Sequence, residues 1–529
     1  MPVVNYDAVI IGAGFAGIYM LHRLRQRGLS VRAYERGDGV GGTWYWNRYP
    51  GARCDVQSME YSYQFDQTLQ QEWQWSERYA SQPEILDYAN HVADRFGLRE
   101  DIQFNTVVKR AHFDETAGCW QVGTDQGEEI ATKYLIMATG SLSVPNVPNI
   151  SGMEDFEGDS YHTGEWPQGG VDFTDRDVAV IGTGSSAIQA IPEIARQAEQ
   201  LYVLQRTPAY AIPARNRPFH PGEQESIKAD YDSFRQQAAS TPSGIGFEIR
   251  EEYALEASAE ARQQQYEQHW QAGGLAFIGA YGDLLIDSNA NDTAAEFVRG
   301  KIREIVNSPR TAEVLSPLQT FGCKRICADS GYYETFNRDN VSLIDLHEEP
   351  IQAIIAQGVV TAQQVVEVDA IVYATGFDAV TGALARIDIR GRNHVALTDK
   401  WAEGPTTYLG LGTEGFPNLF MINGPGSPSV LTNMLPSIEQ HVEWIDNCIS
   451  HLQSHGYQAI EPTLGAELAW VDRVNSLAER TLYPTCNSWY LGANIPGKPR
   501  VFMAYIGFPA YVAKCAEVEA AGYTGFTIT

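Results

Sequence analysis

Two stretches of the chain share one pattern of apolar and small residues. Residues 8–11 (AVII) lead into residues 12–17 (GAGFAG), and residues 178–181 (VAVI) lead into residues 182–187 (GTGSSA). A short apolar run is typical of a buried strand, and the glycines that follow favour a tight turn into a helix. The pattern therefore predicts two strand–turn–helix units, whose turns can bring backbone N–H groups close to a pyrophosphate.

Two further apolar runs end in the same three residues. Residues 134–137 (YLIM) precede Ala-Thr-Gly at 138–140, and residues 371–373 (IVY) precede Ala-Thr-Gly at 374–376. A Rossmann sheet binds its ligand at the carboxyl ends of its strands. Each run is therefore expected to return the chain to a nucleotide.

The middle of the chain differs from the rest in amino-acid composition. Residues 215–319 are rich in Gln, Glu and Ala and poor in β-branched residues, which predicts a helical insertion. Within it, Thr293 and Glu296 have the spacing of a capping box, which predicts that a helix over residues 297–306 begins there. Apolar residues at helical spacing also predict a packing helix that ends at Gly456.

These elements predict an α/β fold with two Rossmann-like dinucleotide-binding domains and a helical insertion in the second. Chain length supports the division, because 529 residues exceed what one hydrophobic core usually organises. We expect the first domain at residues 1–141 and 378–529, the second at residues 142–214 and 320–377, and the insertion at residues 215–319.

Composition and charge narrow the class of protein. Apolar residues make up 44% of the chain, and no apolar run approaches the length of a bilayer crossing, which predicts a soluble protein. Acidic residues outnumber basic residues 66 to 38, so the surface is expected to repel nucleic acid and anionic lipid. The first seven residues show no basic region or cleavage site that would indicate export. We expect a cytoplasmic monomer or small homo-oligomer with no nucleic-acid or membrane partner.

The cysteines are odd in number and scattered, with seven along the chain. Cys323 and Cys327 are the only close pair, and neither His nor a second Cys pair lies at the spacing of a zinc site. We expect reduced thiols that pack in the interior, and no metal site.

The residue that ends the strand after each glycine-rich turn distinguishes the two nucleotides. Residues 31–35 (VRAYE) end in Glu35, and a carboxylate there binds the ribose hydroxyls of a dinucleotide. The strand at residues 201–205 is followed by Arg206, whose guanidinium suits the 2′-phosphate of NADPH. An ordinary tight turn and a solvated surface arginine are the alternatives. Two such units in one chain predict electron transfer from NADPH to a bound FAD.

The chain lacks the thiol pair that disulfide reductases of this two-nucleotide plan require beside the flavin, since no close Cys pair follows the first glycine-rich turn. The other large class activates dioxygen on a reduced flavin, which needs a fixed cation and little water. The sequence therefore favours an oxygen-activating flavin enzyme.

Residues 156–167 (FEGDSYHTGEWP) lie just before the second unit and match the pattern F-x-G-x-x-x-H-x-x-x-W-P. On this pattern the chain resembles the type I Baeyer–Villiger monooxygenases, whose N-oxygenating relatives usually carry an aromatic and a basic residue in place of the final Trp-Pro. Residues 41–55 and the two Ala-Thr-Gly segments also lie where this family has them. Residues 424–431 and 497–503 are most similar to the phenylacetone and steroid monooxygenase branch, within a group that includes the cyclohexanone monooxygenases.

The resemblance implies a reaction and the residues that perform it. NADPH reduces FAD, dioxygen adds to give a peroxyflavin, and the peroxide attacks a ketone to give an ester or lactone. Arg325 is implied as the active-site arginine, which stabilises the peroxide anion and the tetrahedral adduct. Asp55 is implied to hold Arg325 in place. A structural ion pair and a simple turn cap are the alternatives for these two residues.

The resemblance also implies binding, hinge and pocket residues. Lys324 is expected to help Arg206 bind the 2′-phosphate, and Trp489 to contact the nicotinamide nucleotide, with core packing as its alternative. His162 is expected to act in a hinge rather than as a base. The expected cofactor-binding residues are Gly12, Gly14, Phe15, Ala16, Gly17, Glu35, Thr43, Trp44, Asp55, Tyr61, Val108, Met434, Gly182, Thr183, Gly184, Ser185, Ser186, Gln189, Arg206, Thr207, Lys324 and Trp489. The expected hinge residues are Phe156, Gly158, His162, Trp166 and Pro167, and the expected pocket residues are Leu142, Leu431 and Met434.

Two other functions remain open at this point. One is a flavin monooxygenase that acts on nitrogen or sulfur centres through the same chemistry. The other is an NADPH oxidase whose product is hydrogen peroxide. Products formed from ketones and sulfides distinguish the three.

Overall fold

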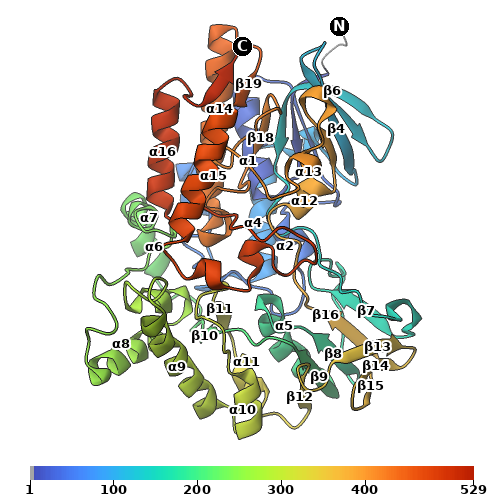
Figure 1. The fold of residues 1–529 in the computed structure, drawn as a ribbon, viewed down its shortest axis with the longest axis vertical. Helices are drawn as coiled ribbons and strands as arrows, with labels where there is room; N and C mark the ends of the chain where they lie inside the picture. The colour runs from blue at the N-terminus through green and yellow to red at the C-terminus, as the bar shows by residue number, and fades with distance from the viewer. Residues whose placement is uncertain (1–4) are drawn as a thin grey trace.

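The computed structural model describes residues 5–529, so the first four residues of the N-terminal segment lie outside the described part. Two β-sheets form the centres of two units, one above the other in Figure 1. The upper unit is built from both ends of the chain, blue and orange to red, and the lower unit from its middle (Figure 1). This is the α/β fold with two dinucleotide-binding units that the sequence predicts.

The first sheet has eight strands and joins a parallel part to an antiparallel part. Its order is β17-β4-β5-β6-β1-β2-β3, and β18 pairs with β6 off this path. β6 pairs parallel with β1 and antiparallel with β5, so it connects the two parts. The strands are β1 (Tyr6–Ile11), β2 (Val31–Tyr34), β3 (Ile102–Gln103), β4 (Val108–Asp114), β5 (Cys119–Thr124), β6 (Glu129–Met137), β17 (Asp388–Arg390) and β18 (Leu419–Met421).

The second sheet has five parallel strands in the order β12-β9-β8-β16-β7. Its central strand pair contains the apolar runs that the sequence marks as strands, and both are buried. The strands are β7 (Asp159–His162), β8 (Asp177–Ile181), β9 (Gln200–Gln205), β12 (Val341–Asp345) and β16 (Ala370–Tyr373). Smaller sheets contain β13 (Ile351–Ile355), β14 (Gly358–Thr361) and β15 (Val365–Glu367), β10 (Ala211–Pro213) and β11 (Cys327–Asp329), and β19 (Ile460–Pro462) and β20 (Phe526–Ile528).

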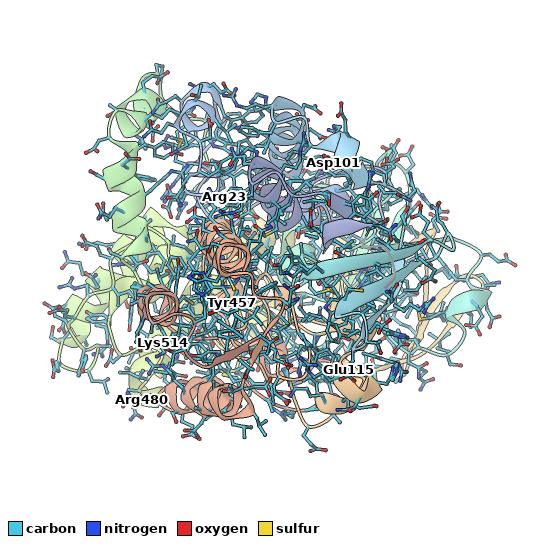
Figure 2. The ribbon with its side chains drawn as sticks, turned by 90° about the horizontal axis from the view of Figure 1, so that it is seen from above. Arg23, Asp101, Glu115, Tyr457, Arg480 and Lys514 are labelled. Atoms are coloured by element: carbon cyan, nitrogen blue, oxygen red, sulfur yellow. A yellow bond between two sulfur atoms is a disulfide. The ribbon has the colours of Figure 1, made fainter. Side chains whose placement is uncertain are left out.

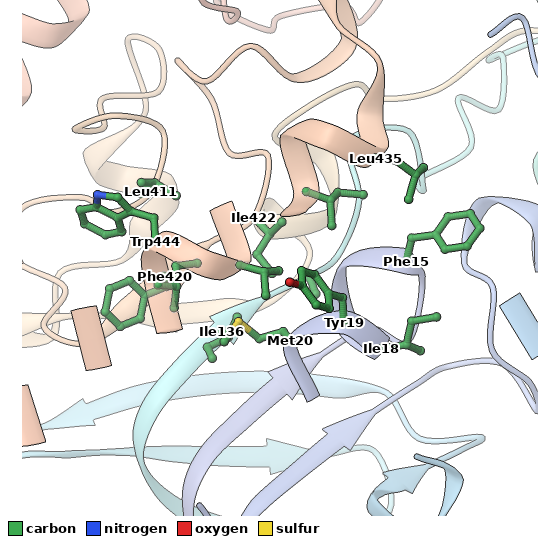
Figure 3. Close-up of a cluster of buried hydrophobic side chains, with 14 of the residues drawn as sticks. Phe15, Ile18, Tyr19, Met20, Ile136, Leu411, Phe420, Ile422, Leu435 and Trp444 are labelled. Atoms are coloured by element: carbon green, nitrogen blue, oxygen red, sulfur yellow. The ribbon is translucent and has the colours of Figure 1, made fainter. Parts of the chain in front are cut away.

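Helix α1 (Phe15–Gln26) packs between the first sheet and helix α14 (Met434–His455). Figure 3 shows this contact, with Tyr19 of α1 among the buried side chains above Ile136 of β6. The long helix confirms the predicted packing helix, and it ends where predicted, at Gly456 with φ of 74°. The other helices outside the insertion are α2 (Thr43–Trp46), α3 (Gln67–Glu72), α4 (Gln82–Arg95), α5 (Ser185–Ala195), α11 (Tyr332–Thr335), α12 (Gly382–Ala385), α13 (Leu397–Lys400), α15 (Leu464–Ala478) and α16 (Phe508–Ala520).

A buried carboxylate fastens α1 to α14. Asp446 on α14 has a side chain that is only 1% exposed, and it accepts hydrogen bonds from Arg23 of α1 and from Arg27, the C-cap residue of that helix. Figure 2 shows this end of the molecule from above, with Arg23 labelled. Removing one partner of a buried pair costs several kcal/mol. The pairing fixes the helix that follows the first glycine-rich turn.

The insertion is helical, but it packs against both units. Tyr266 and Phe297 join the core of the second unit, whereas Tyr231 and Ile245 join the core of the first. The domain boundaries in this region stay predictions. The helices are α6 (Glu223–Lys228), α7 (Tyr231–Ala239), α8 (Ala259–Ala272), α9 (Ser288–Ile305) and α10 (Pro309–Leu315).

The predicted start of helix α9 was wrong. The helix begins at Ser288, because the Asp287 side chain caps it by accepting a hydrogen bond from the Ala290 amide at 2.8 Å. Thr293 lies inside the helix, and its hydroxyl donates to the Ala290 carbonyl at 2.7 Å. A capping-box spacing inside an existing helix is therefore not a helix start.

The expectation that every cysteine is a reduced thiol was also wrong. Cys323 and Cys486 form a disulfide, with their Cα atoms 5.6 Å apart and a sequence separation of 163 positions. That Cα separation lies within the range that a disulfide requires. The other five cysteines are free and buried, as expected: Cys54, Cys119, Cys327, Cys448 and Cys515.

The described residues contain neither a membrane-spanning helix nor a cluster of metal ligands. Within residues 5–529, no helix is both long enough and apolar enough to cross a bilayer. In the same residues, His, Cys, Asp and Glu side chains do not gather in groups of three that could hold a metal ion.

Candidate functional site

The first glycine-rich turn is built so that only glycine fits. Gly12 has φ of 106°, and a Cβ on it would lie 2.4 Å from the Ala138 carbonyl oxygen. A Cβ on Gly17 would lie 1.9 Å from the Gly12 carbonyl oxygen. The first Ala-Thr-Gly segment thus packs directly against the turn, and its Ala138 amide extends the ladder by donating to Ile11. The turn leaves the N-terminus of α1 facing the edge of the sheet where a pyrophosphate binds.

Glu35 lies at the carboxyl end of β2, next to this turn. Its carboxylate accepts hydrogen bonds from the Ala13 and Gly37 amides, each at 2.8 Å. The side chain is buried, so it is oriented before any ligand arrives. This position and chemistry fit the ribose hydroxyls of FAD.

Aromatic side chains surround the first turn. Phe15 meets the Tyr61 ring edge-on at 6.0 Å, and the Trp44 indole donates to the Tyr61 hydroxyl at 3.1 Å. Exposed Thr43 begins α2, which packs so closely that a Cβ on Gly42 would lie 2.8 Å from the Gly14 Cα. These predicted cofactor-binding residues therefore lie together. Val108 lies in a different core cluster, at the start of β4.

The second turn repeats the first. Gly182 has φ of 113°, and a Cβ on it would lie 2.5 Å from the carbonyl oxygen of Ala374, in the second Ala-Thr-Gly segment. Ala187 is fully buried, in agreement with a purely packing role at the third position of the motif. A Cβ on Gly184 would meet no protein atom within 4 Å. Exposed Gly184 and Ser185 at the start of α5 therefore leave room for a pyrophosphate.

Two cations gather beyond this turn. Arg206 is exposed at the end of β9, and half-buried Lys324 is close enough to interact with it. Burial, and then the charge of Arg206, lower the pKa of Lys324. Within residues 5–529, neither side chain forms an ion pair with the protein's own carboxylates. A dianionic 2′-phosphate suits such a pair, since it would satisfy both charges.

Arg325 and Asp55 meet between the two units. The guanidinium donates from Nη2 to Asp55 Oδ1 at 3.0 Å and from Nε to Asp55 Oδ2, and its Nη1 donates to the Val430 carbonyl at 2.8 Å. The two side chains are 25% and 20% exposed. Burial lowers the pKa of Arg325, but the charge and hydrogen bonds of Asp55 outweigh this and raise it above the usual value. The guanidinium therefore stays charged.

Apolar side chains lie around the exposed edge of this pair. Leu431 directly follows the carbonyl that Arg325 binds, and a Ser141–Ser429 hydroxyl contact at 3.1 Å brings the neighbouring Leu142 to the same place. Leu142 and half-buried Trp489 share one small cluster. Met434 begins α14 and is half-buried too. The predicted pocket residues are thus half-buried and packed against the core of the first unit, and their role as a pocket stays a prediction.

The segment that matches the family pattern connects the two units. Buried Trp166 packs on Phe173 of the second unit, while its backbone N–H donates to Trp46 of the first at 3.2 Å. Gly158 and Phe156 pack against each other beside the edge of β16, and exposed Pro167 follows the tryptophan. Trp166 thus contacts both units, whereas Phe156 packs against the core of the second, and the hinge role of the segment stays a prediction.

His162 has both ring nitrogens occupied. Nδ1 accepts from the Gly164 amide at 2.9 Å, and Nε2 lies 3.3 Å from the Thr375 hydroxyl, which itself donates to Asn146. Burial lowers the pKa of His162, against the opposing charge of Glu165. A neutral imidazole with both nitrogens hydrogen-bonded fits a structural role better than a role in proton transfer.

Gln189, a predicted cofactor-binding residue on α5, contacts the first unit. Its carbonyl oxygen accepts from the Tyr49 hydroxyl at 2.9 Å and its amide donates to the Arg53 carbonyl at 3.0 Å. Both ends of this side chain therefore bind the loop that leads to Asp55 in the first unit.

The sequence did not mark three features of this site. Tyr483 and Tyr490 lie near enough to Arg325 for its charge to act on both hydroxyls. Cys486 lies between them and is bonded to Cys323, two residues before Arg325. Nothing in the sequence pattern distinguishes these residues from core residues, because the contact spans more than 150 positions.

Two dinucleotide turns, one followed by a carboxylate and the other by an arginine, define a flavoprotein that uses NADPH. Comparison with known proteins agrees. The family model described as pyridine nucleotide-disulphide oxidoreductase matches residues 9–231, which exclude both cysteines of the disulfide. A Baeyer–Villiger monooxygenase from Pseudooceanicola batsensis is 43% identical over 98% of this chain and 96% of its own.

Two further relatives differ in what they act on. A phenazine N-monooxygenase from Lysobacter antibioticus is 41% identical over 99% of this chain and 97% of its own. The solved structure of an oxidised steroid monooxygenase bound to NADP is 50% identical, covers 99% of both chains and superposes with a TM-score of 0.95. The chain belongs to the Baeyer–Villiger monooxygenases, and its cofactors are FAD and NADPH.

Proposed function

We propose that this protein uses dioxygen to insert one oxygen atom beside the carbonyl of an apolar ketone, giving an ester or a lactone. The observation that carries the proposal is the Arg325–Asp55 pair, a fixed cation between two dinucleotide units that also binds the Val430 carbonyl, next to Leu431. FAD, once reduced by NADPH, supplies the activated oxygen.

Arg325 is proposed as the catalytic cation. Oxygen addition to a ketone places negative charge on the former carbonyl oxygen, and a guanidinium that is charged at every working pH stabilises that charge. Asp55 and the Val430 carbonyl bind three of its N–H groups, so the remaining donors have a fixed direction. A cation that is already in place needs no reorganisation during the reaction.

The remaining proposed roles concern binding. Arg206 and Lys324 hold the 2′-phosphate of NADPH, and Trp489 contacts its nicotinamide end. Leu142, Leu431 and Met434 line the substrate pocket and exclude water. A steroid monooxygenase among the relatives agrees with a ketone that carries a large apolar body. The relative named for phenazine N-oxidation makes nitrogen oxygenation a second activity to test, although the Trp-Pro ending of residues 156–167 favours ketones.

The test is turnover under labelled dioxygen. The purified protein with FAD and NADPH is given cyclic, aryl and steroidal ketones, together with sulfides and aromatic amines, and products are identified by mass spectrometry. An ester or lactone with one labelled oxygen supports the proposal. Labelled oxides of sulfur or nitrogen with every ketone unchanged, or hydrogen peroxide alone, contradict it.

The Arg325→Ala variant tests the residue that carries the proposal. We expect ester formation to fall by at least about a hundredfold, because one preorganised charge donor is lost, while NADPH is still oxidised. The control is Arg196→Ala, which removes an exposed arginine paired with Glu193 and should leave ester formation unchanged. Ester formation retained in Arg325→Ala would exclude the assigned role.

A further inference from the structure

The segment that carries Trp489 has little regular structure of its own. Residues 479–507 lie between α15 and α16 and contain only two three-residue helical turns, Tyr483–Thr485 and Trp489–Leu491. No sheet ladder or α-helix therefore fixes this segment, all of which the structure describes. Its position depends on individual hydrogen bonds and packing contacts with the rest of the molecule.

Those contacts lie at both ends of the segment and in its middle. Near its start, the Leu482 amide donates to the Leu285 carbonyl of the insertion at 2.8 Å. Near its end, Asn494 donates to the Phe377 carbonyl at 2.8 Å, and Lys498 binds Asp378. The only covalent contact is the bond between Cys486 and Cys323 in the middle.

The covalent contact joins two proposed parts of the active site. Cys323 is followed directly by Lys324 and Arg325, and Cys486 precedes Trp489 by three residues. Both cysteines are buried in the core of the first unit, although residues 326 and 327 belong to the core of the second. The bond thus fastens the chain at the point where it passes from one unit to the other.

Two tyrosines near Cys486 in the chain, Tyr483 and Tyr490, also lie near Arg325. Tyr483 and Tyr490 pack edge-on with ring centroids 5.7 Å apart. Burial raises the pKa of Tyr483 to about 12, and the nearby charge of Arg325 opposes the shift. The same two influences act on Tyr490, with burial prevailing. The cross-linked segment therefore forms one wall beside the guanidinium.

We infer that Cys323 and Cys486 are positioning residues for the oxygenation reaction, whose disulfide holds the Trp489 segment against the Lys324–Arg325 segment. The inference rests on the roles proposed above for those three residues. A covalent tie removes the freedom of the segment before NADPH binds, so less ordering is left for binding to impose. It also keeps the nicotinamide contact at a fixed distance from the catalytic cation, and small displacements at such sites cost rate.

The bond forms and opens by two-electron chemistry. On formation, two thiols lose two electrons and two protons to a disulfide oxidant such as oxidised glutathione, which becomes two thiols. On opening, a dithiol such as dithiothreitol supplies two electrons and two protons to the cysteine sulfurs and is itself converted to a disulfide. The state of the bond can therefore be set without a mutation.

Counting thiols tests whether the bond exists. Denatured, unreduced protein should react with five equivalents of a maleimide, and reduced protein with seven, since five cysteines are free. Seven equivalents before reduction would overturn the inference. This readout is independent of any catalytic activity.

Turnover then tests the role of the bond. The bond is opened by dithiothreitol or by the Cys323→Ser/Cys486→Ser double variant. We expect the KM for NADPH to rise roughly fivefold and the ester formed per NADPH to halve. The rate of NADPH oxidation at saturation should stay nearly unchanged. Oxidised glutathione should restore the wild type but not the double variant. The Cys119→Ser variant, which removes a free cysteine on β5, should behave as wild type in both states.

A merely structural disulfide gives a different result. In that case the Tm falls by roughly 5 °C or more when the bond opens, while KM and coupling stay as they were at 25 °C, and the inference is overturned. Protein that forms no ester in any state contradicts the proposed function instead. The two failures are thus distinguishable.

Discussion

At the scale of single residues, the two dinucleotide-binding units differ in the charge of one equivalent residue. Glu35 and Arg206 each follow the strand next to a glycine-rich turn. The carboxylate of Glu35 is buried and bound to two backbone amides, whereas Arg206 is exposed and lies near a second cation, Lys324. We propose that the charges of these two side chains, rather than the fold around them, select the nucleotide of each unit.

The Arg206→Ala variant should lose the preference for NADPH over NADH. We expect kcat/KM for NADPH to fall about a hundredfold, as a charge-assisted contact to phosphate is lost, and kcat/KM for NADH to change less than about threefold. Initial rates with both nucleotides measure this. Arg196→Ala serves again as the control, and an equal loss with both nucleotides would place Arg206 away from the 2′-phosphate.

Glu439 is a buried carboxyl that makes stability depend on pH. Burial raises its pKa to about 8, although the Gln64 and Phe65 amides and Arg235 favour the charged form. Its folded-state pKa lies above its unfolded value, so its contribution to stability is complete at about pH 4.5 and is lost as pH rises through about 8. A glutamine at position 439 keeps an oxygen that accepts from the Gln64 and Phe65 amides, but it cannot ionise.

We therefore expect Glu439→Gln to have the wild-type Tm at pH 5 and a higher Tm at pH 8.5. The gain should be about 1–3 kcal/mol, or a few degrees. Thermal unfolding followed across this pH range checks it, with exposed Glu479→Gln as the matched control. A Tm difference that does not change with pH would contradict the assignment.

At the scale of elements, the same turn is built twice from the same contacts. In each unit the first glycine of the turn packs on the alanine of an Ala-Thr-Gly segment. The amide of that alanine donates to the last residue of the strand that leads into the turn, which is β1 or β8. The sequence predicted both turns because each depends on neighbours within one short unit. It misplaced the start of α9, because Asp287 caps the helix and the Thr293 hydroxyl, inside it, bonds instead to the Ala290 carbonyl and the Tyr266 hydroxyl.

Two alanine substitutions in one turn should have different effects. Gly182→Ala should destabilise the protein by roughly 2 kcal/mol or more, because its φ is positive and a carbonyl oxygen lies where Cβ would be. Gly184→Ala should cost only about 0.5–1 kcal/mol, since its Cβ meets no protein atom and alanine is merely a poorer N-cap of α5 than glycine. It should instead raise the KM for NADPH about tenfold, as its Cβ would occupy the space of the pyrophosphate. An unchanged KM in Gly184→Ala would mean that the nucleotide lies elsewhere.

At the scale of the whole molecule, the candidate site is assembled from segments far apart in sequence. Arg325 binds Asp55 across 270 positions, and the Val430 carbonyl is supplied by a third segment. The sequence predicted Arg325 and Asp55 by resemblance to a family, but local patterns contain no signal for their contact. The same reason explains why the disulfide and the division of the insertion between two cores were not predicted.

The disulfide closes a ring of chain that passes through both units. Residues 324–485, which include β12, β16, β18 and α14, lie between its two cysteines. A protease that cuts the backbone once anywhere in this stretch would leave both fragments in a single covalent molecule. The nicked protein would therefore migrate as an intact chain on a gel until the sulfur–sulfur bond is reduced.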